Sequence, residues 1–214
     1  MTVDDAPPAP HLDRDRNSRR SADRFVERRD QLATAALQTL AELGYARTSL
    51  REIAQHSDFS HGVLHYYFTD KVELITYCVQ QYKAECVTRY DQIVASAATA
   101  DDLGRAFAAS LAGTVADDAT MHRLWYDLRN QSLFEEAYRL DVAQIDASLQ
   151  QMIWRVVSRY AELAGAPVAV SPAQAYAICD GIFLQALWRF LAGQTEALDE
   201  LRSSVVALLP RLLV

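Results

Sequence analysis

The chain has few of the residues that interrupt helices or cross-link small folds. Its 214 residues include only seven glycines, six prolines and three cysteines, while half of all residues are hydrophobic. Sparse glycine and proline together with abundant Ala, Leu, Gln, Glu and Arg favour an all-helical protein. An odd number of isolated cysteines argues against a disulfide framework and indicates small buried side chains.

Long apolar runs are also absent. No hydrophobic stretch approaches the roughly 20 residues needed to span a bilayer. The N-terminal segment MTVDDAPPAPHLDRDRN has no apolar core that could direct secretion. We therefore expect a cytoplasmic protein without a membrane partner.

Motifs of catalysis and metal binding are missing as well. The chain contains no Gly-x-Ser-x-Gly, Walker, Gly-x-Gly-x-x-Gly or His-Glu-x-x-His motif, so the sequence predicts neither an enzyme nor a bound cofactor. His61 and His65 have the spacing of a metal-binding pair, but no third or fourth ligand follows at a matching spacing. We therefore predict no metal site.

Charge is unevenly distributed along the chain, which carries a net charge of −7. Residues 14–71 hold ten Arg or Lys and eight Asp or Glu, for a charge of +2, whereas residues 1–13 carry −3 and residues 72–214 carry −6. A mildly basic head thus precedes an acidic body. Long-range attraction to DNA would be modest, so local phosphate contacts would have to position the head.

The stretch from Thr48 to Lys71 has the pattern of two short helices about a tight turn. Ser49 and Glu52 form a Ser-x-x-Glu capping box, in which each side chain can satisfy a backbone donor of the other. Ser60 can cap a second helix over residues 61–67. One core is expected to collect the apolar residues Leu50, Ile53, Ala54, Leu64 and Phe68. Such a helix-turn-helix is a compact DNA-reading unit.

Amphipathic periodicity predicts further helices on both sides of this unit. They span about residues 23–43, 71–97, 101–117, 120–130, 133–164, 171–193 and 195–209. Gly44 supplies a left-handed stop for the first of them. Asp70 with Glu73, and Ser171 with Gln174, form capping boxes, and the second box has a proline at the first helical position.

Residues 1–20 lack this periodicity and are rich in proline. They run into the arginine-rich segment RDRNSRRSADRFVERR, and we expect a disordered arm here. Its arginines belong either to a solvated tail with an exposed helix start or to an arm that contacts the minor groove or phosphates.

The last two expected helices are more apolar than one core face requires. Their apolar residues are Ile178, Ile182, Phe183, Leu187, Phe190, Leu191, Leu198, Leu201, Val205 and Leu208. They can pack as a pair within one chain. We favour a homodimeric four-helix interface, because two-fold dimers are the commonest oligomers and a helix-turn-helix head benefits from reading two half-sites.

Several segments of the head match a known family. They are Gly44-Tyr45, Thr48-Ser49-Leu50-Arg51-Glu52-Ile53-Ala54, Ser60-His61-Gly62-Val63-Leu64, Tyr67-Phe68 and Lys71. In these residues the chain resembles the TetR family of one-component transcriptional regulators. The resemblance implies an all-α fold of about nine helices, with a three-helix helix-turn-helix head and a C-terminal helical ligand-binding and dimerisation domain. The domains would be a disordered Arg-containing arm over 1–20, the head over 21–70 and the body over 71–214.

The resemblance also assigns DNA contacts within the head. The recognition helix N-terminus, where side chains reach base edges and amides meet phosphate, would present Ser60, His61, Gly62 and Val63. Contacts to backbone phosphates, which position the head without reading sequence, would come from Thr48, His65, Tyr66, Tyr67 and Lys71. The chain departs from the family pattern at Asp58, where the turn often has Gly, and at His65, where a Tyr is usual.

For the body, the resemblance implies a small ligand that changes the affinity of the head for its operator. Expected pocket residues, on helices that should face inward, are Tyr82, Phe107, Leu111, Trp125, Leu128, Arg129, Met152, Phe183 and Trp188. Each can equally be ordinary core. An aromatic cage with acids nearby suits a cationic ligand, and a flat apolar compound or acyl chain is equally compatible.

We therefore expect a ligand-responsive repressor that binds a palindromic operator as a homodimer through its two C-terminal helices. Its partners would be double-stranded operator DNA and a small-molecule effector, with two recognition helices in successive major grooves about 34 Å apart. The alternative is a helical protein that binds a small molecule or a partner without touching DNA. That alternative predicts a buried or blocked Tyr66 or Lys71.

Overall fold

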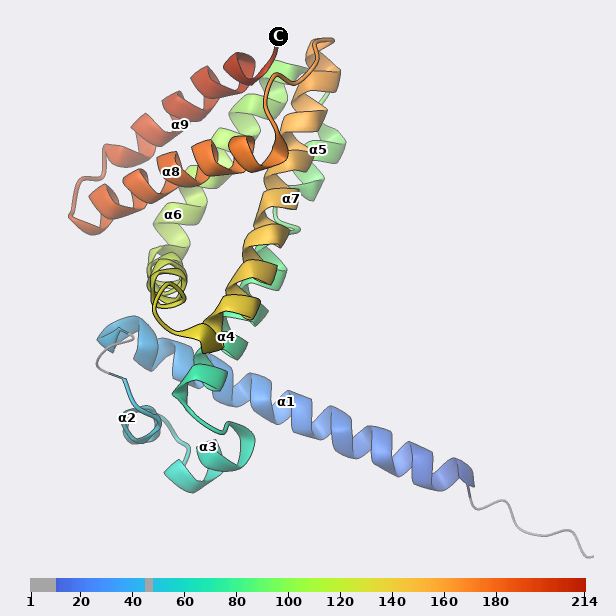
Figure 1. Ribbon diagram of the computed structural model, residues 1–214, viewed down its shortest axis with the longest axis vertical. Helices are drawn as coiled ribbons and strands as arrows, with labels where there is room; N and C mark the ends of the chain where they lie inside the picture. Colours follow the sequence, from blue (N-terminus) through green and yellow to red (C-terminus); the bar gives the residue numbers. More distant parts are fainter. Residues whose placement is uncertain (1–10, 45–47) are drawn as a thin grey trace, which may run out of the picture.

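The chain folds into a small helical head below a larger helical body, with one long helix projecting sideways from the head (Figure 1). The computed structural model describes residues 11–44 and 48–214. These ranges contain nine α-helices and two short 3-10 helices: α1 (His11–Leu43), α2 (Leu50–Gln55), α3 (His61–Tyr67), α4 (Lys71–Cys86), α5 (Asp91–Ser96), α6 (Ala100–Gln131), η1 (Glu136–Tyr138), α7 (Arg139–Ala164), α8 (Pro172–Leu191), α9 (Ala197–Leu208) and η2 (Leu209–Leu212). The predicted all-α fold is confirmed. No described helix is both long and apolar enough to cross a membrane.

Helix α1 begins well before the expected residue 23. Residues 11–20, which the sequence placed in a disordered arm, are the first turns of this helix. The reason is local, since Pro10 is the last helix breaker before Gly44. Gly44 then ends α1 with a φ of 76°, as its left-handed preference predicts. The rest of the expected arm, and Tyr45 of the family match, lie outside the described residues.

Helix α4 is shorter than the expected helix over 71–97, because side chains satisfy the carbonyls at its end. The Thr88 hydroxyl donates to the Glu85 carbonyl at 3.1 Å, and Arg155 of α7 donates to the Val87 carbonyl at 2.5 Å. Side-chain bonds of this kind compete with the helical ladder. The chain turns here and continues as the separate helix α5.

Helix α6 replaces the two helices expected over 101–117 and 120–130. It runs through both segments and bends at Asp118, whose φ of −118° and ψ of 21° are not helical. The Asp118 carboxylate lies 2.9 Å from the Arg89 guanidinium, which follows α4. A tertiary ion pair therefore holds the bend.

Two hydrophobic cores divide the molecule, and α4 belongs to both. The head core is built by α1 to α4 around residues such as Ile53, and the body core lies among α4 and α6 to α9. Leu74 and Cys78 of α4 lie in the head core, whereas Ile75 and Val79 lie in the body core. Each of these two turns of α4 thus contributes one residue to the head core and one to the body core.

The predicted N-terminal caps form in three of the helices. Ser49 and Glu52 make the reciprocal capping box of α2, and Ser171 and Gln174 make that of α8. The Ser60 side chain accepts a hydrogen bond from the third residue of α3 at 3.3 Å. These local signals placed the helix starts correctly.

The cap of α4 forms differently from the predicted box. The Asp70 carboxylate accepts from the Glu73 amide at 2.9 Å, as expected, but Glu73 accepts from the amide of Thr69 at 2.8 Å. That bond and the nearby Arg29 hold the pKa of Glu73 below its ordinary value. Glu73 is drawn away from Asp70 because it also binds helix α1.

Polar contacts fasten α4 to α1 across the head. Arg29 donates to the Glu73 carboxylate at 2.7 Å, and its guanidinium lies 4.6 Å and 4.5 Å from the ring centroids of Phe68 and Tyr77. The Tyr77 hydroxyl donates to Asp30 of α1 at 2.6 Å. A movement of α4 must therefore carry α1 with it or break these contacts.

We predict that Ser49→Ala lowers the free energy of unfolding by about 1 kcal/mol, since it removes the cap that starts the helix-turn-helix. Ser148 is the matched control, because its exposed hydroxyl donates to the Gln144 carbonyl inside α7 rather than capping a helix. Ser148→Ala should change the free energy of unfolding by less than about 0.5 kcal/mol. Urea unfolding followed by circular dichroism measures both changes, and equal losses would contradict the capping role.

Candidate functional site

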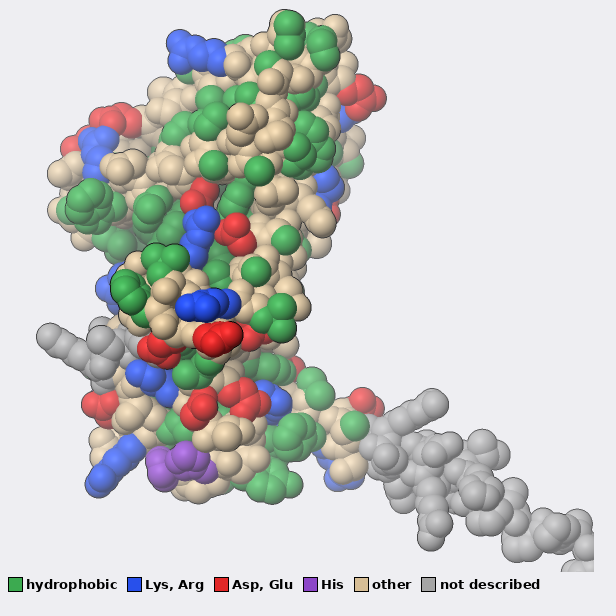
Figure 2. All heavy atoms as spheres, viewed as in Figure 1, with side chains coloured by type: hydrophobic (Ala, Val, Ile, Leu, Met, Phe, Trp, Pro, Cys, Tyr) green, Lys and Arg blue, Asp and Glu red, His purple; other side chains and the backbone are tan. Residues whose placement is uncertain are grey.

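The N-terminal end of α3 is presented at the surface of the head. His61, Gly62 and His65 are exposed, and Val63 is half-buried. The rings of His61 and His65 lie edge to face with centroids 4.4 Å apart. Figure 2 shows histidine side chains at the end of the head that points away from the body. A partner can therefore contact α3 at this end without contacting the body.

An aromatic cluster fixes the position of Tyr66 on α3. Tyr66 is 73% exposed, and its ring contacts Tyr67 and Phe25 with centroid distances of 4.9 Å and 6.3 Å. Tyr67 is half-buried, with its centroid 4.8 Å from that of Phe25. Sequence reasoning missed the supporting role of Phe25, which lies on α1 and meets α3 only in the fold. Lys71, also half-buried, begins α4 next to this group.

Thr48 does not lie where the expected phosphate contact requires. It is 3% exposed, and its hydroxyl donates to the Gly44 carbonyl at 2.6 Å. The side chain therefore closes the end of α1 instead of facing outward. Its β-branched hydroxyl found a backbone acceptor four residues earlier, which is a common local alternative to an external contact.

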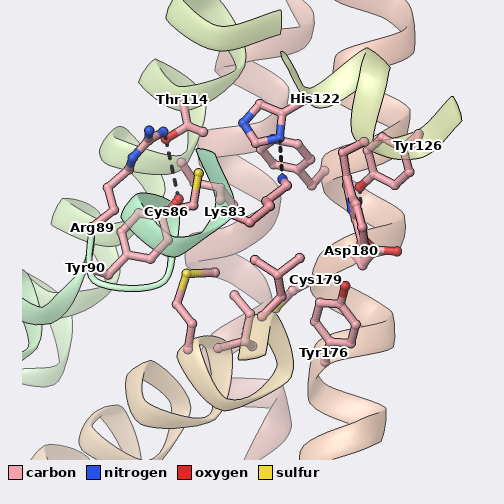
Figure 3. A pocket seen from close by; sticks show the side chains of 16 residues that line it. Lys83, Cys86, Arg89, Tyr90, Thr114, His122, Tyr126, Tyr176, Cys179 and Asp180 are labelled. Atoms are coloured by element: carbon pink, nitrogen blue, oxygen red, sulfur yellow. Dashed lines mark hydrogen bonds between the residues drawn. The ribbon is translucent and has the colours of Figure 1, made fainter. Parts of the chain in front are cut away.

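A second candidate site is a cavity in the body between α4, α6, α7 and α8 (Figure 3). The free space among its side chains is about 60 Å³, enough for roughly four water molecules. The lining residues are Lys83, Cys86, Arg89, Tyr90, Leu111, Thr114, His122, Trp125, Tyr126, Leu149, Met152, Ile153, Tyr176, Cys179, Asp180 and Phe183. The mixture of aromatic and aliphatic walls with a few polar groups matches the lining of small-molecule sites, but the volume is well below the roughly 300–1,000 Å³ of such pockets.

Lys83 extends from α4 across the cavity toward His122 of α6 (Figure 3). Lys83 is only 4% exposed, and its Nζ lies 3.3 Å from His122 Nδ1. Nζ also lies 5.3 Å from the ring centroid of Trp125 and 5.4 Å from that of Tyr82. His122 Nε2 is 3.2 Å from the Tyr82 hydroxyl. With Lys83 donating to Nδ1, the neutral imidazole carries its proton on Nε2 and donates to Tyr82.

Asp180 of α8 lies across the cavity from Lys83, and its charge is already compensated. Its carboxylate accepts from Arg129 at 2.6 Å and from the Tyr126 hydroxyl at 2.8 Å. Arg129 also lies 3.2 Å from Asp146, which accepts from a tyrosine hydroxyl of α8 at 2.8 Å. These contacts tie α6, α7 and α8 together beside the cavity.

Arg89 is compensated in the same way. It pairs with Asp118 at the bend of α6 and donates to the Thr114 hydroxyl at 2.9 Å. Tyr90 Oη lies 3.5 Å from the same hydroxyl oxygen. Two cations line the cavity, Lys83 and Arg89. In the described part of the chain, Arg89 has a carboxylate within 4 Å and Lys83 has none.

Comparison with known proteins identifies the head. Residues 32–78 match the sequence model of the bacterial regulatory proteins of the tetR family. The chain thus carries the sequence signature of the TetR family in its head. No curated relative matches it in sequence.

Solved structures of TetR-family and related regulators share the fold over most of the chain. A TetR transcription regulator from Haloarcula marismortui has a TM-score of 0.72 at 17% identity, covering 88% of this chain and 100% of its own. A TetR-family regulator from Agrobacterium tumefaciens gives 0.68 at 20% identity, covering 87% and 100%. The transcriptional regulator FadR from Bacillus subtilis, solved in complex with stearoyl-CoA, gives 0.67 at 17% identity, covering 84% and 96%. The protein thus has the fold of these regulators.

The expected pocket residues of the body separate into three groups. The cavity wall contains Leu111, Trp125, Met152 and Phe183. Residues adjacent to the wall, in contact with its members or in the same core, are Tyr82, Phe107, Leu128 and Arg129. Trp188 is 69% exposed on α8 and does not face inward as expected. The apolar surplus on α8 made its inner and outer faces indistinguishable in sequence.

Sequence reasoning also missed the polar groups of the cavity. Lys83 follows Val79 and precedes Cys86 at intervals of four and three, which places it on the apolar stripe of α4. His122 lies three residues before Trp125 on the corresponding stripe of α6. A lysine and a histidine on inward-facing stripes were the signal that could have found this site.

Burial shifts the pKa values of these groups in one direction, toward their neutral forms. Burial, followed by the nearby Lys83 and Arg89 charges, lowers the pKa of His122 to about 2. Burial lowers the pKa of Lys83 to about 8. Burial raises the pKa of Tyr90 and of Cys179 to about 12 each. Lys83 is thus charged near neutral pH but at a cost in stability.

We predict that Lys83→Met stabilises the protein at neutral pH, because a buried ammonium gives way to an apolar side chain. The pKa of Lys83 falls from an ordinary 10.5 to about 8 on folding, so the unfolded chain binds more protons between these pH values. Stability of the unmodified protein should therefore rise by about 3 kcal/mol across this window. Urea unfolding at several pH values from about 7 to about 10 measures the difference in the free energy of unfolding between Lys83→Met and the unmodified protein. This difference should become smaller as the pH rises. A difference that does not change with pH would contradict the lowered pKa of Lys83.

Proposed function

We propose that the protein is a dimeric repressor whose α3 helices read a palindromic operator in the cytoplasm, and whose body cavity binds the small molecule that releases it. The observation that carries the proposal is the geometry of α4, which begins directly after α3 and ends at the cavity. The head over 21–70 and the body over 71–214 are then the two functional domains. Arg20 and Arg24, which are exposed on α1, would add positive charge to the head.

In the head, α3 would enter the major groove with its N-terminal end first. His61, Gly62 and Val63 would meet base edges, where an imidazole can hydrogen-bond and a valine methyl can contact thymine. Contacts to phosphates would come from Ser60, His65, Tyr66, Tyr67 and Lys71. The exposed Tyr66 supports this arrangement over the alternative of a helical binding protein that does not touch DNA, which required Tyr66 or Lys71 to be buried or blocked.

Dimerisation would use α8 and α9, which lie together on one side of the body (Figure 1). Their outward residues include large apolar side chains, namely Ile178, Leu184, Trp188, Leu191 and Val206. Figure 2 shows hydrophobic side chains gathered on this part of the surface. A closed two-fold pairing of these helices would bury the patch and place two heads on successive major grooves.

Coupling between ligand and DNA would pass through α4. A ligand larger than a few waters must move the cavity walls, because the free space is only about 60 Å³. Lys83 and Cys86 belong to that wall, and two turns earlier Tyr77 binds Asp30 of α1. Displacement of α4 would then reorient α1 and alter the spacing of the two heads. The coupling is reciprocal, so operator DNA should weaken ligand binding by the same factor.

Fluorescence anisotropy with DNA flanking the protein's own gene tests the proposal. We expect binding that weakens steeply with salt, since phosphate contacts supply most of the affinity. Lys71→Ala should weaken binding by a similar factor on every sequence, whereas His61→Ala should change which sequence is preferred. Absence of salt-sensitive binding at low ionic strength would overturn the DNA-binding role.

The dimer interface is tested by Leu184→Glu and Trp188→Glu. Each introduces a charge into the apolar patch, so we expect monomers in sedimentation equilibrium and at least a tenfold loss of operator affinity, about 1.4 kcal/mol or more. Phe134→Glu is the matched control, because Phe134 is 78% exposed but lies outside α8 and α9. A Phe134 variant that also dissociates, or Trp188 and Leu184 variants that stay dimeric, would place the interface elsewhere.

A further inference from the structure

Lys83 is a buried cation that the described protein groups satisfy only in part. An ammonium group has three hydrogen-bond donors. Among the described residues, His122 is the one acceptor within hydrogen-bonding distance, at 3.3 Å from Nζ. The imidazole is neutral and so supplies no negative charge, and the rings of Trp125 and Tyr82 offer only their electron-rich faces. A buried charge of this kind is stabilised strongly by a close anion.

The other two charged groups of the cavity wall, Asp180 and Arg89, already have partners of opposite charge. Asp180 is held by Arg129 and the Tyr126 hydroxyl, and Arg89 is held by Asp118. A cationic ligand would have to displace Arg129 from Asp180 and would approach the Lys83 ammonium at close range. An anionic ligand meets an ammonium that no carboxylate occupies. The sequence was equally compatible with a cationic ligand and with an apolar compound or acyl chain. The arrangement of charges disfavours the cationic ligand.

The remainder of the wall is apolar. Leu149, Met152 and Ile153 of α7 line the cavity together with Phe183 of α8 and Trp125 of α6. These side chains suit a hydrophobic ring or short chain, whose burial contributes about 25 cal/mol per Å² of apolar surface. The lining therefore offers one charged group and an otherwise largely apolar wall to a ligand that displaces the cavity walls.

We propose that the effector is a small apolar molecule with a single anionic oxygen group, a carboxylate or a phenolate, which forms an ion pair with Lys83. This inference rests on the proposed ligand-binding role of the cavity and names the chemical class of its ligand. The anion takes the donors of Nζ that His122 leaves open, while the apolar body lies against α7 and α8. Because Lys83 belongs to α4, the ion pair acts directly on the helix that packs against the head.

The test measures binding of three matched probes to the full-length protein, without DNA. Benzoate, benzamide and benzylammonium share a phenyl ring and differ in the charge of the attached group. Ligand-observed NMR titration should give an affinity for benzoate at least tenfold higher than for benzamide, and weaker binding still for benzylammonium. Equal affinity for benzoate and benzamide, tighter binding of benzylammonium, or no binding of any probe at millimolar concentration would overturn the proposal.

A variant comparison assigns the preference to Lys83. Lys83→Met should bind benzoate and benzamide equally, since it keeps an apolar side chain and loses only the counter-ion. Arg105→Met is the control, because Arg105 is an exposed cation of α6 paired with Asp101 and Asp102, and it should keep the preference for benzoate. Preference for benzoate that survives in Lys83→Met would overturn the ion pair. Benzamide binding, unchanged between the unmodified protein and Lys83→Met, shows that the cavity is intact in the variant.

The two proposals fail separately. The probe titrations contain no DNA, so their result is independent of whether the head binds an operator. Loss of the benzoate preference with intact DNA binding would overturn the ligand class alone. Absent DNA binding with an intact benzoate preference would overturn the regulatory function and keep the Lys83 site.

Discussion

The structure depends on one constraint, which is that α4 must be buried on two sides at once. Leu74 and Cys78 complete the head core, while Ile75 and Val79 complete the body core. Packed interiors resist gradual deformation, since their side chains interlock at crystal-like density. A rotation or shift of α4 that suits one core therefore disturbs the other, and the helix serves as the rigid connection between them.

Ion pairs and hydrogen bonds hold α4 to its neighbours at its start, middle and end. Near the head, Arg29 and Asp30 hold the first turns of α4. In the middle, Gln80 donates to Asp141 of α7 at 2.6 Å. At the end, Arg89 joins the bend of α6. Lys83 lies between the last two contacts without a carboxylate of its own among the described residues, so an anion bound beside it would act directly on α4.

The two exposed surfaces follow different physical rules. The surface of α3 is polar and carries small or hydrogen-bonding side chains, which suits hydrated DNA grooves and phosphates. The outer faces of α8 and α9 expose large apolar side chains, which favours burial against an identical surface. Because the head carries only a small positive charge, pairing of two heads would compensate for weak attraction between one head and DNA.

The sequence by itself determined the features that rest on contacts within a few residues. The caps at Ser49, Ser60 and Ser171, the stop at Gly44 and the apolar stripes of the helices were all predictable, because each depends on neighbours three or four positions away. The family followed from the same short segment. Inward-facing residues such as Trp125 could be expected in the cavity wall for the same reason.

Only the tertiary structure decided the pairings between distant elements. It joined Asp180 to Arg129, turned Trp188 outward and Thr48 inward, and ended α4 where Arg155 reaches the Val87 carbonyl. It also left Lys83 facing a neutral imidazole. Each of these outcomes depends on which polar group lies across the gap once the helices pack, and helical periodicity in one segment carries no information about its partner in another.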